Sequence, residues 1–242
     1  MEYWNKCKFE DGQFKPLVLT DEQTQVLLTG KFGDGCFIYT NRSVFFSANC
    51  IYKDYIDFKA SLLGDLCNRK DKVVNRGYKE GLVYRVYTSA DPRIAFICDE
   101  SLEDSFNRMN ELGLALWVYD DGSLHKEKEF YQINTQKYPR EVIEDLFIPA
   151  LKRKFGITAK STIERRRDGR EFWYLRISKY EGSDIISSAL DKYPVSCFNY
   201  KRWKPETTQK WNKLVKESKE SGIDLSLLST KTLGSMFRKI SL

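Results

Sequence analysis

The sequence predicts an α/β (α+β) protein built from two similar halves. Two apolar segments rich in small residues each end in Asp-Gly: VLLTGKFGDG at residues 26–35 and LALWVYDDG at residues 114–122. Aligning Asp34 on Asp121 gives an offset of 121 − 34 = 87 residues, and the following segments then align without gaps. In both copies the pattern reads as helix, strand, short turn, strand and helix. A repeat of this length indicates a duplicated unit.

The strands of the two copies correspond position by position. Residues of similar kind coincide at Phe37 and Leu124, Val44 and Tyr131, Phe46 and Ile133, Ala48 and Thr135, and Ile56 and Ile143. Further along, GLVYRVYTS at residues 81–89 has a counterpart in REFWYLRIS at residues 170–178, and each follows a charged turn with a glycine. The duplication therefore extends into a second pair of strands.

The starts of the two repeated helices carry capping signals. Thr20 and Gln23 have the spacing of a capping box, and Asn110 is a suitable N-cap for the second helix. Both helices also contain small residues that would let two backbones approach closely, namely Gly30, Gly33, Gly113 and Ala115. We therefore expect the helices to pack side by side, with Asp34 and Asp121 close together at their C-terminal ends.

Composition excludes several classes of protein. The chain has 242 residues, 41% of them hydrophobic, and no apolar run approaches the roughly 20 residues of a membrane span. The N-terminus shows no apolar signal segment, so we expect a protein that is not secreted. Six cysteines without a CxxC pair and a single histidine, His125, exclude the usual zinc spacings and favour a reducing compartment. A net charge of +6 is only a mild signal for a polyanionic partner.

Acidic residues at a helix C-terminus are unfavourable, because the helix dipole places partial negative charge there. Asp34, and Asp120 with Asp121, occupy such ends. Paired carboxylates beside unpaired backbone carbonyls are hard oxygen ligands of the kind that Mg²⁺ prefers, so a divalent cation would supply the missing positive charge. The alternative is that Asp-Gly simply ends each helix in a turn, with glycine at positive φ.

These segments resemble the two signature helices of the LAGLIDADG homing endonucleases in their single-chain form. The second half is the closer match, because DDGS, INTQ, KFGI and NYK follow in the order typical of that family. The resemblance covers roughly residues 15–205. The first half is more diverged, and Lys31 stands at a position that is usually apolar.

The resemblance implies two pseudo-symmetric α-β-β-α-β-β-α halves that form a saddle-shaped antiparallel sheet over DNA, with the signature helices packed at the centre. It implies residues 1–105 and 106–203 as the two halves, followed by a helical extension at residues 204–242. Asp34 and Asp121 would be the catalytic metal ligands, with backbone carbonyls from Gly33 and Asp120. Lys201 would be the basic catalytic residue of one site. The first half offers Arg93 but no lysine where one is expected, so the two sites are expected to be unequal.

Strand parity predicts which side chains face DNA. In residues 130–136, Tyr131, Ile133 and Thr135 should lie against the helices, which directs the alternate residues, including Phe130, outward. Trp173, Leu175 and Ile177 suit the core. The predicted DNA-binding residues are Ser47, Arg76, Lys79, Arg85, Gln132, Asn134, Gln136, Arg165, Arg166, Arg167, Arg170 and Arg176.

The resulting hypothesis is a site-specific endonuclease that makes double-strand breaks in a long DNA target. Mg²⁺ would be its cofactor, and Mn²⁺ could substitute. We expect a monomer that binds double-stranded DNA and no membrane, and that lies inside the cell or organelle where its target DNA is found. Two alternatives of the same fold are an RNA maturase whose partner is an intron RNA, and a DNA-binding regulator that has lost cleavage. The presence of both aspartates argues against such a loss.

Overall fold

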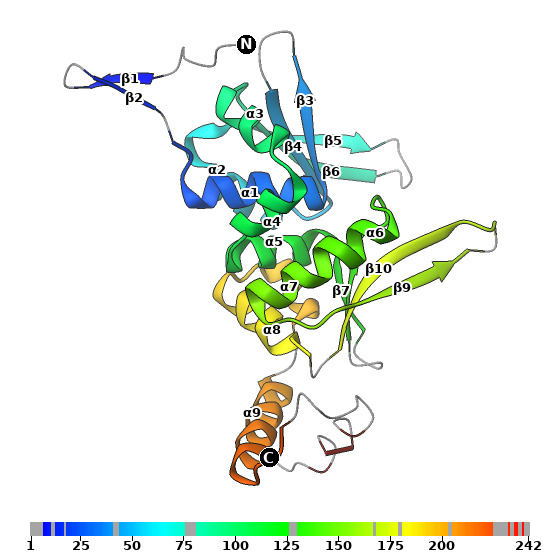
Figure 1. Ribbon diagram of the computed structural model, residues 1–242. Helices are drawn as coiled ribbons and strands as arrows, with labels where there is room; N and C mark the ends of the chain where they lie inside the picture. Colours follow the sequence, from blue (N-terminus) through cyan, green and yellow to red (C-terminus); the bar gives the residue numbers. More distant parts are fainter. Residues whose placement is uncertain are drawn as a thin grey trace. The chain divides into compact units, whose positions relative to one another are not determined.

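The computed structural model describes most of the chain, in two compact units (Figure 1). Unit 1 contains Met1–Asp121 with Val195–Cys197, and unit 2 contains Gly122–Pro194 with Phe198–Leu242. The described residues are 7–10, 13–16, 18–40, 44–75, 81–125, 130–166, 168–178, 181–202, 205–224, 232, 235–236 and 239.

Unit 1 is a four-stranded antiparallel sheet covered by helices. Its sheet has the order β3-β4-β6-β5, and a separate pair is formed by β1 and β2. Helices α1, α2 and α3 pack against one face of the sheet (Figure 1). The elements are β1 (Cys7–Glu10), β2 (Gln13–Pro16), α1 (Asp21–Phe32), β3 (Gly35–Tyr39), β4 (Val44–Cys50), α2 (Lys53–Leu63), η1 (Gly64–Leu66), β5 (Cys67–Asn75), β6 (Gly81–Thr88), α3 (Pro92–Asp99), α4 (Leu102–Arg108) and α5 (Glu111–Asp121).

Unit 2 repeats the same sheet topology. Its sheet has the order β7-β8-β10-β9, so in both sheets the strands run first, second, fourth and third along the chain. The elements are β7 (Gly122–His125), β8 (Phe130–Asn134), α6 (Arg140–Val142), the π-helical turn η2 (Ile143–Phe147), α7 (Ile148–Phe155), β9 (Lys160–Arg165), β10 (Glu171–Ser178), α8 (Ser183–Lys192), η3 (Ser196–Lys201) and α9 (Pro205–Glu220). The mixed α/β class and the duplicated antiparallel sheets that the sequence predicts are confirmed.

The two repeated helices, α1 and α5, pack against each other within unit 1. Residues 23–30 of α1 and residues 112–119 of α5 are all buried, so each helix is enclosed on every side. A helix with this environment does not need an apolar stripe, which explains why neither sequence is clearly amphipathic. The close approach of these two helices is the central contact of unit 1.

Polar groups at the starts of α1 and α5 join the two helices. Thr20 and Gln23 form the predicted capping box, with Gln23 N donating to Thr20 Oγ1 at 3.2 Å and Thr20 N donating to Gln23 Oε1 at 2.9 Å. Asn110 caps α5 by accepting from Gly113 N at 3.1 Å. The buried amide of Gln25 donates to Arg108 O and accepts from Asn110 N, so it connects α1 directly to the first turn of α5.

The small residues of α1 and α5 have different partners. A Cβ at Gly113 would lie 2.4 Å from Gln25 Oε1 of α1, as expected for a residue that lets helices approach. The expectation for Gly30 is wrong. A Cβ at Gly30 would instead lie 2.3 Å from Phe46 Cε2 and 3.4 Å from Gly35 Cα, both in the β3–β4 hairpin. Gly30 therefore lets the sheet, rather than the partner helix, approach α1.

The glycine of the first Asp-Gly sequence is explained by close packing. Gly35 is not among the glycines with positive φ, so the turn does not require a left-handed residue there. A Cβ at Gly35 would lie 2.4 Å from Gly30 Cα, which is closer than any real contact. The alternative explanation of this motif as a positive-φ turn therefore does not hold for the first half.

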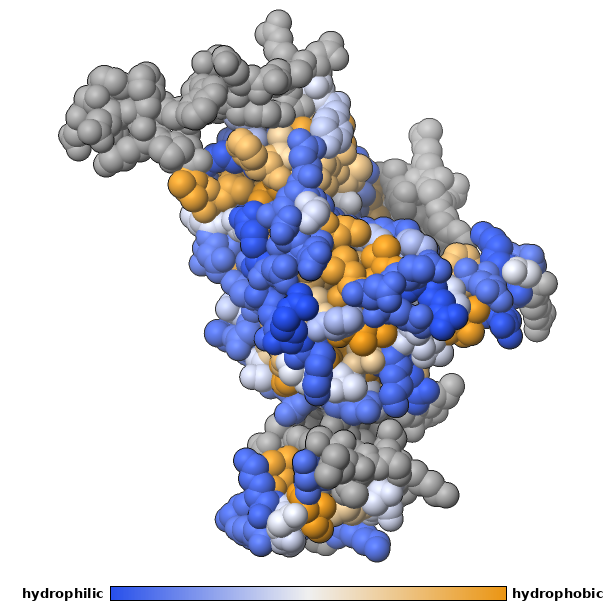
Figure 2. Space-filling model, in the orientation of Figure 1, coloured by the Kyte–Doolittle hydropathy of each residue, from blue (hydrophilic) through white to orange (hydrophobic). Residues whose placement is uncertain are grey.

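The C-terminal extension begins with the predicted helix, α9. The rest of the expected helical extension, beyond α9, falls largely outside the described residues. No helix of the described part of the chain is long and apolar enough to cross a membrane. The surface view shows hydrophilic residues interspersed with apolar patches on the visible face (Figure 2).

The contact between Gly30 and the β3–β4 hairpin generates a stability prediction. Gly30→Ala should lower the free energy of unfolding by about 1–2 kcal/mol, because overpacking against the buried ring of Phe46 exceeds the gain in helix propensity. Gly81→Ala is the control, since nothing lies within 4 Å of a Cβ there, and should change stability by less than about 0.5 kcal/mol. Denaturant unfolding of both variants would test this, and equal midpoints would contradict it.

Candidate active site

The acidic ends of α1 and α5 lie together in unit 1. Gly33 caps the C-terminal end of α1, and its N–H donates to Thr29 O at 2.8 Å. A Cβ at Gly33 would lie 3.1 Å from Asp121 Oδ2 and 2.8 Å from Asp120 Cβ. Asp34, the next residue, is exposed, and Asp121, the last residue of α5, is half-buried. The two aspartates therefore belong to helix ends that are in direct contact.

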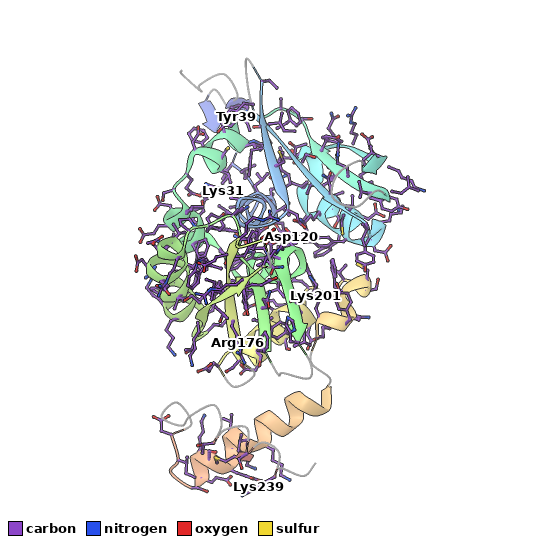
Figure 3. All side chains as sticks on the ribbon, turned by 90° about the vertical axis from the view of Figure 1, so that its right-hand side faces the viewer. Lys31, Tyr39, Asp120, Arg176, Lys201 and Lys239 are labelled. Atoms are coloured by element: carbon purple, nitrogen blue, oxygen red, sulfur yellow. The ribbon has the colours of Figure 1, made fainter. Side chains whose placement is uncertain are left out.

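The carboxylate of Asp120 is occupied by groups from α2. Lys59 Nζ donates to Asp120 Oδ1 at 2.7 Å and to Oδ2 at 2.9 Å, and Tyr55 Oη donates to Oδ1 at 2.6 Å. The side chains of both Lys59 and Asp120 are only 1% exposed. Figure 3 labels Asp120 in the interior, among the side chains that surround the helices. This ion pair anchors the last turn of α5 to α2.

Because this ion pair is buried, the loss of either partner would strongly destabilise the fold. Removing one partner of a buried pair typically costs about 3–5 kcal/mol, because the other charge is left uncompensated in a medium of low dielectric constant. The pKa of Tyr55 is raised well above its ordinary value, first by burial and then by the charge of Asp120, so Tyr55 stays protonated and donates. Burial also raises the pKa of the nearby Cys50 thiol.

Lys59 is a buried partner of the acidic helix end that the sequence did not predict. The sequence predicts a metal ion as the positive charge beside the acidic helix ends, but the carboxylate of Asp120 pairs with Lys59 instead. A signal was present in the buried positions of α2, Tyr55, Ile56, Lys59, Ala60 and Leu63, which form a helical stripe. A lysine within such a stripe indicates a buried acidic partner.

The donor set at the helix ends fits a divalent metal. This set consists of the carboxylates of Asp34 and Asp121 and backbone carbonyls at the C-terminal ends of two helices, all hard oxygen ligands. Among the described residues no group of three His, Cys, Asp or Glu side chains forms a ready metal cluster. A cation held here would therefore depend on two side-chain carboxylates together with backbone oxygens and water.

Two cationic residues of the first half are committed to structural contacts. Lys31 Nζ donates to Ile97 O at 2.9 Å, to Ser105 Oγ at 3.1 Å and to Glu100 O, so it compensates the carbonyl end of α3. Burial lowers the pKa of Lys31. Arg93 pairs with Asp91, its Nη2 lying 2.9 Å from Asp91 Oδ2. The three hydrogen bonds of Lys31 explain why an ammonium is tolerated at this usually apolar position.

Lys201 lies in unit 2, at the end of η3. It is 4% exposed, its Nζ is 4.5 Å from the centroid of the Phe198 ring, and its carbonyl accepts from Tyr131 Oη at 2.7 Å. The residue is thus held by unit 2 through both its backbone and its side chain. Its assignment as the basic catalytic residue of one site stays a prediction.

The sheet of unit 2 orients most of its side chains as strand parity predicts. Tyr131, Ile133 and Thr135 are buried, Gln136 is exposed, and Gln132 donates to Asn134 at 3.0 Å. Phe130 is the exception, because it points outward yet is only 5% exposed. The ring of His125 stacks on it at 4.5 Å, and the guanidinium of Arg176 lies 4.2 Å from its centroid. These two groups cover the outward ring.

The arginines near the β9–β10 turn are exposed and paired with acids of the same hairpin. Arg165 Nε lies 2.8 Å from Glu171, Arg166 Nε lies 3.8 Å from Glu164, and Arg170 Nη2 lies 2.7 Å from Asp168. Exposed pairs of this kind contribute roughly 0–1 kcal/mol, so a phosphate can replace the acid as partner. Arg167 lies outside the described residues.

In unit 1 the outward face of the sheet is partly closed by its own side chains. Arg85 donates to Tyr87 Oη at 2.6 Å and to Asn49 Oδ1, a neighbour that the sequence reasoning did not name. Ser47 pairs with Cys36 on one side and Tyr87 on the other, and it is 5% exposed. Ser47 is therefore a poor candidate for direct base contact in this conformation. The other two predicted residues of this half, Arg76 and Lys79, lie outside the described residues.

The sequence matches the LAGLIDADG DNA endonuclease family over residues 32–185, which is more than half of the chain. The chain belongs to this family. A curated relative, the probable intron-encoded DNA endonuclease 3 of Mycosarcoma maydis, is 39% identical over 54 residues. That match spans 22% of this chain and 39% of the relative, so it covers well under half the length of that curated relative.

The chain is similar to solved structures of homing endonucleases. The homing endonuclease I-WcaI bound to its DNA recognition sequence superposes with a TM-score of 0.64 at 17% identity, covering 78% of this chain and 88% of that one. I-DmoI in complex with DNA and Mn gives a TM-score of 0.44 at 13% identity, covering 73% of this chain and 98% of that one. The family match and the superposition on I-WcaI confirm the LAGLIDADG fold expected from the signature helices.

Proposed function

We propose that this protein is a site-specific homing endonuclease that hydrolyses both strands of a long double-stranded DNA target in a divalent-metal-dependent reaction. The observation that carries the proposal is the contact between two acidic helix ends, which brings Gly33 against the carboxylates of Asp120 and Asp121. Membership of the family and the DNA-bound state of I-WcaI support DNA as the partner. The protein would act as a monomer, because one chain carries both signature helices, and would work where its target DNA lies.

Each residue of the proposed site has a distinct task. Asp34 and Asp121 would hold Mg²⁺, or Mn²⁺ in its place, with help from the carbonyls of Gly33 and Asp120. When bound, the metal would activate water and stabilise the leaving oxygen of the phosphodiester. Lys201 would add positive charge at one of the two sites. The outward residues of both sheets would hold the duplex in register through phosphate and base contacts.

Two other functions of the same fold stay as alternatives. An intron RNA maturase would use the outward sheet faces on RNA, and a cleavage-deficient regulator would bind DNA without cutting it. The regulator would have no use for the two retained aspartates, Asp34 and Asp121. RNA binding that exceeds DNA binding in a direct competition would favour the maturase.

The first experiment tests metal-dependent cleavage. The full chain is incubated with a library of randomised DNA duplexes, and cut ends are captured by ligation and sequenced. We expect a single long target, cut on both strands in Mg²⁺ or Mn²⁺, with binding but little cutting in Ca²⁺. Chelator should abolish cutting, because the proposed reaction needs the metal to activate water and to stabilise the leaving oxygen. Undiminished cutting in excess chelator would overturn the proposed metal site.

The aspartates should be needed for cleavage but not for DNA binding. Asp34→Asn and Asp121→Asn keep the shape of each side chain but remove a negative charge from the metal site, so each should abolish double-strand cleavage. Lys201→Met should instead slow one strand more than the other, so that nicked DNA accumulates. Strand-specific end labels on the selected target measure both effects. Parental cutting by Asp34→Asn would show that the first signature helix is only structural.

The arginines of the β9–β10 hairpin should contribute to affinity through phosphates. Ala substitutions at Arg165, Arg166 and Arg167 should each weaken DNA binding and reduce the slope of log affinity against log salt by about 0.9 per lost phosphate contact. Lys152→Ala is a matched control, since Lys152 is an exposed cation on α7 whose ammonium already donates to Thr158. Equal affinities at all salt concentrations, with unchanged melting temperatures, would refute the assignment.

A further inference from the structure

The buried ion pair between Lys59 and Asp120 has no equivalent in the other half of the duplication. The same offset of 87 residues places Asp120 on Gly33 (120 − 33 = 87) and Leu146 on Lys59 (146 − 59 = 87). The second pair of positions thus holds a glycine and a leucine, which carry no charge. One half of this duplicated fold therefore forms without an ion pair at these positions, and the fold alone does not explain why the other half has one.

The pair lies directly beside the proposed metal ligands. Asp120 is adjacent in sequence to Asp121, and a Cβ at Gly33 would lie 2.9 Å from Asp120 Oδ2 and 3.1 Å from Asp121 Oδ2. Without Lys59, three carboxylates would gather at these helix ends. Calcium and magnesium sites tune affinity through the number of charged ligands, so a third carboxylate would change how tightly the metal is held.

We propose that Lys59 is a positioning residue that holds the carboxylate of Asp120 away from the metal and cancels its charge, so that only Asp34 and Asp121 act as anionic side-chain ligands. This inference rests on the proposed function. The geometry supports it, because both oxygens of Asp120 accept from Lys59 and one also accepts from Tyr55, at 2.6–2.9 Å. An oxygen engaged in this way is directed toward α2.

The proposal predicts opposite effects from the two single variants. Lys59→Met leaves an extra negative charge beside the site and should tighten metal binding by about three- to tenfold, whereas Asp120→Asn leaves an extra positive charge and should weaken it by about the same factor. The double variant Lys59→Met/Asp120→Asn restores the original net charge and should bind the metal within about twofold of the parent. A purely structural role would move all three variants in one direction.

The test measures binding separately from catalysis. Calorimetry follows the titration of Ca²⁺ into the complex of the full chain with the DNA duplex recovered by the cleavage selection. Thermal melting of the same proteins is recorded alongside, because Lys59→Met should also lower the melting temperature markedly. Lys53→Met is the matched control, since Lys53 is an exposed lysine of the same helix that pairs with Asp57, and it should leave both readouts unchanged.

The outcomes distinguish failure of the proposed endonuclease function from failure of the proposed role of Lys59. If the parent neither binds Ca²⁺ nor cleaves in Mg²⁺, the proposed function fails and this inference fails with it. If the parent does both, but the single variants shift affinity in the same direction, or the double variant binds as weakly as Asp120→Asn, only the role of Lys59 is overturned. If Lys59→Met does not fold, Asp120→Asn and the double variant decide, through weakening in the first and restoration in the second.

Discussion

The arrangement of unit 1 depends on how the negative charge at the end of α5 is compensated. This helix is buried on every side and ends in two adjacent carboxylates, at the pole where the backbone carbonyls already concentrate negative potential. Water cannot screen the carboxylate of Asp120, whose side chain is 1% exposed, so the protein supplies Lys59. Asp121 is half-buried and reaches the surface where a soluble cation can approach. One helix end thereby combines an internally neutralised acid with the acid that is proposed to bind a metal.

Close backbone contacts hold these charges in place. Gly33 fits against the side chains of Asp120 and Asp121, and Gly35 fits against Gly30. A methyl group at either position would push the end of α1 away from its neighbour by a substantial part of an ångström. Electrostatic interactions in a site of low dielectric constant change steeply with distance. The lack of a side chain at Gly33 and Gly35 is therefore as important to the site as the carboxylates.

Local and periodic features of this molecule could be predicted from the sequence, whereas pairings across the chain could not. The capping box of Thr20, the orientation of Ile133 and the repeat that joins Asp34 to Asp121 depend on neighbours a few residues away or on a regular alignment. The partner of Asp120 lies 61 residues earlier on another helix, and no local pattern names it. The burial of Ser47 likewise follows from cross-strand neighbours, Cys36 and Tyr87, that only the register of the sheet reveals.

The presence of the Lys59–Asp120 pair in one half, and of uncharged residues at the matching positions of the other, follows from the energetics of burial. An aspartate at position 120 without Lys59 would be a buried, unpaired charge, and Lys59 opposite a glycine would be one as well. The two residues are therefore favourable only together, which explains why the other half carries neither. A symmetric dimer of identical halves would place the pair at both sites or at none. A single chain with two signature helices removes that restriction, so that a buried charge can lie beside one proposed metal ligand and not beside the other.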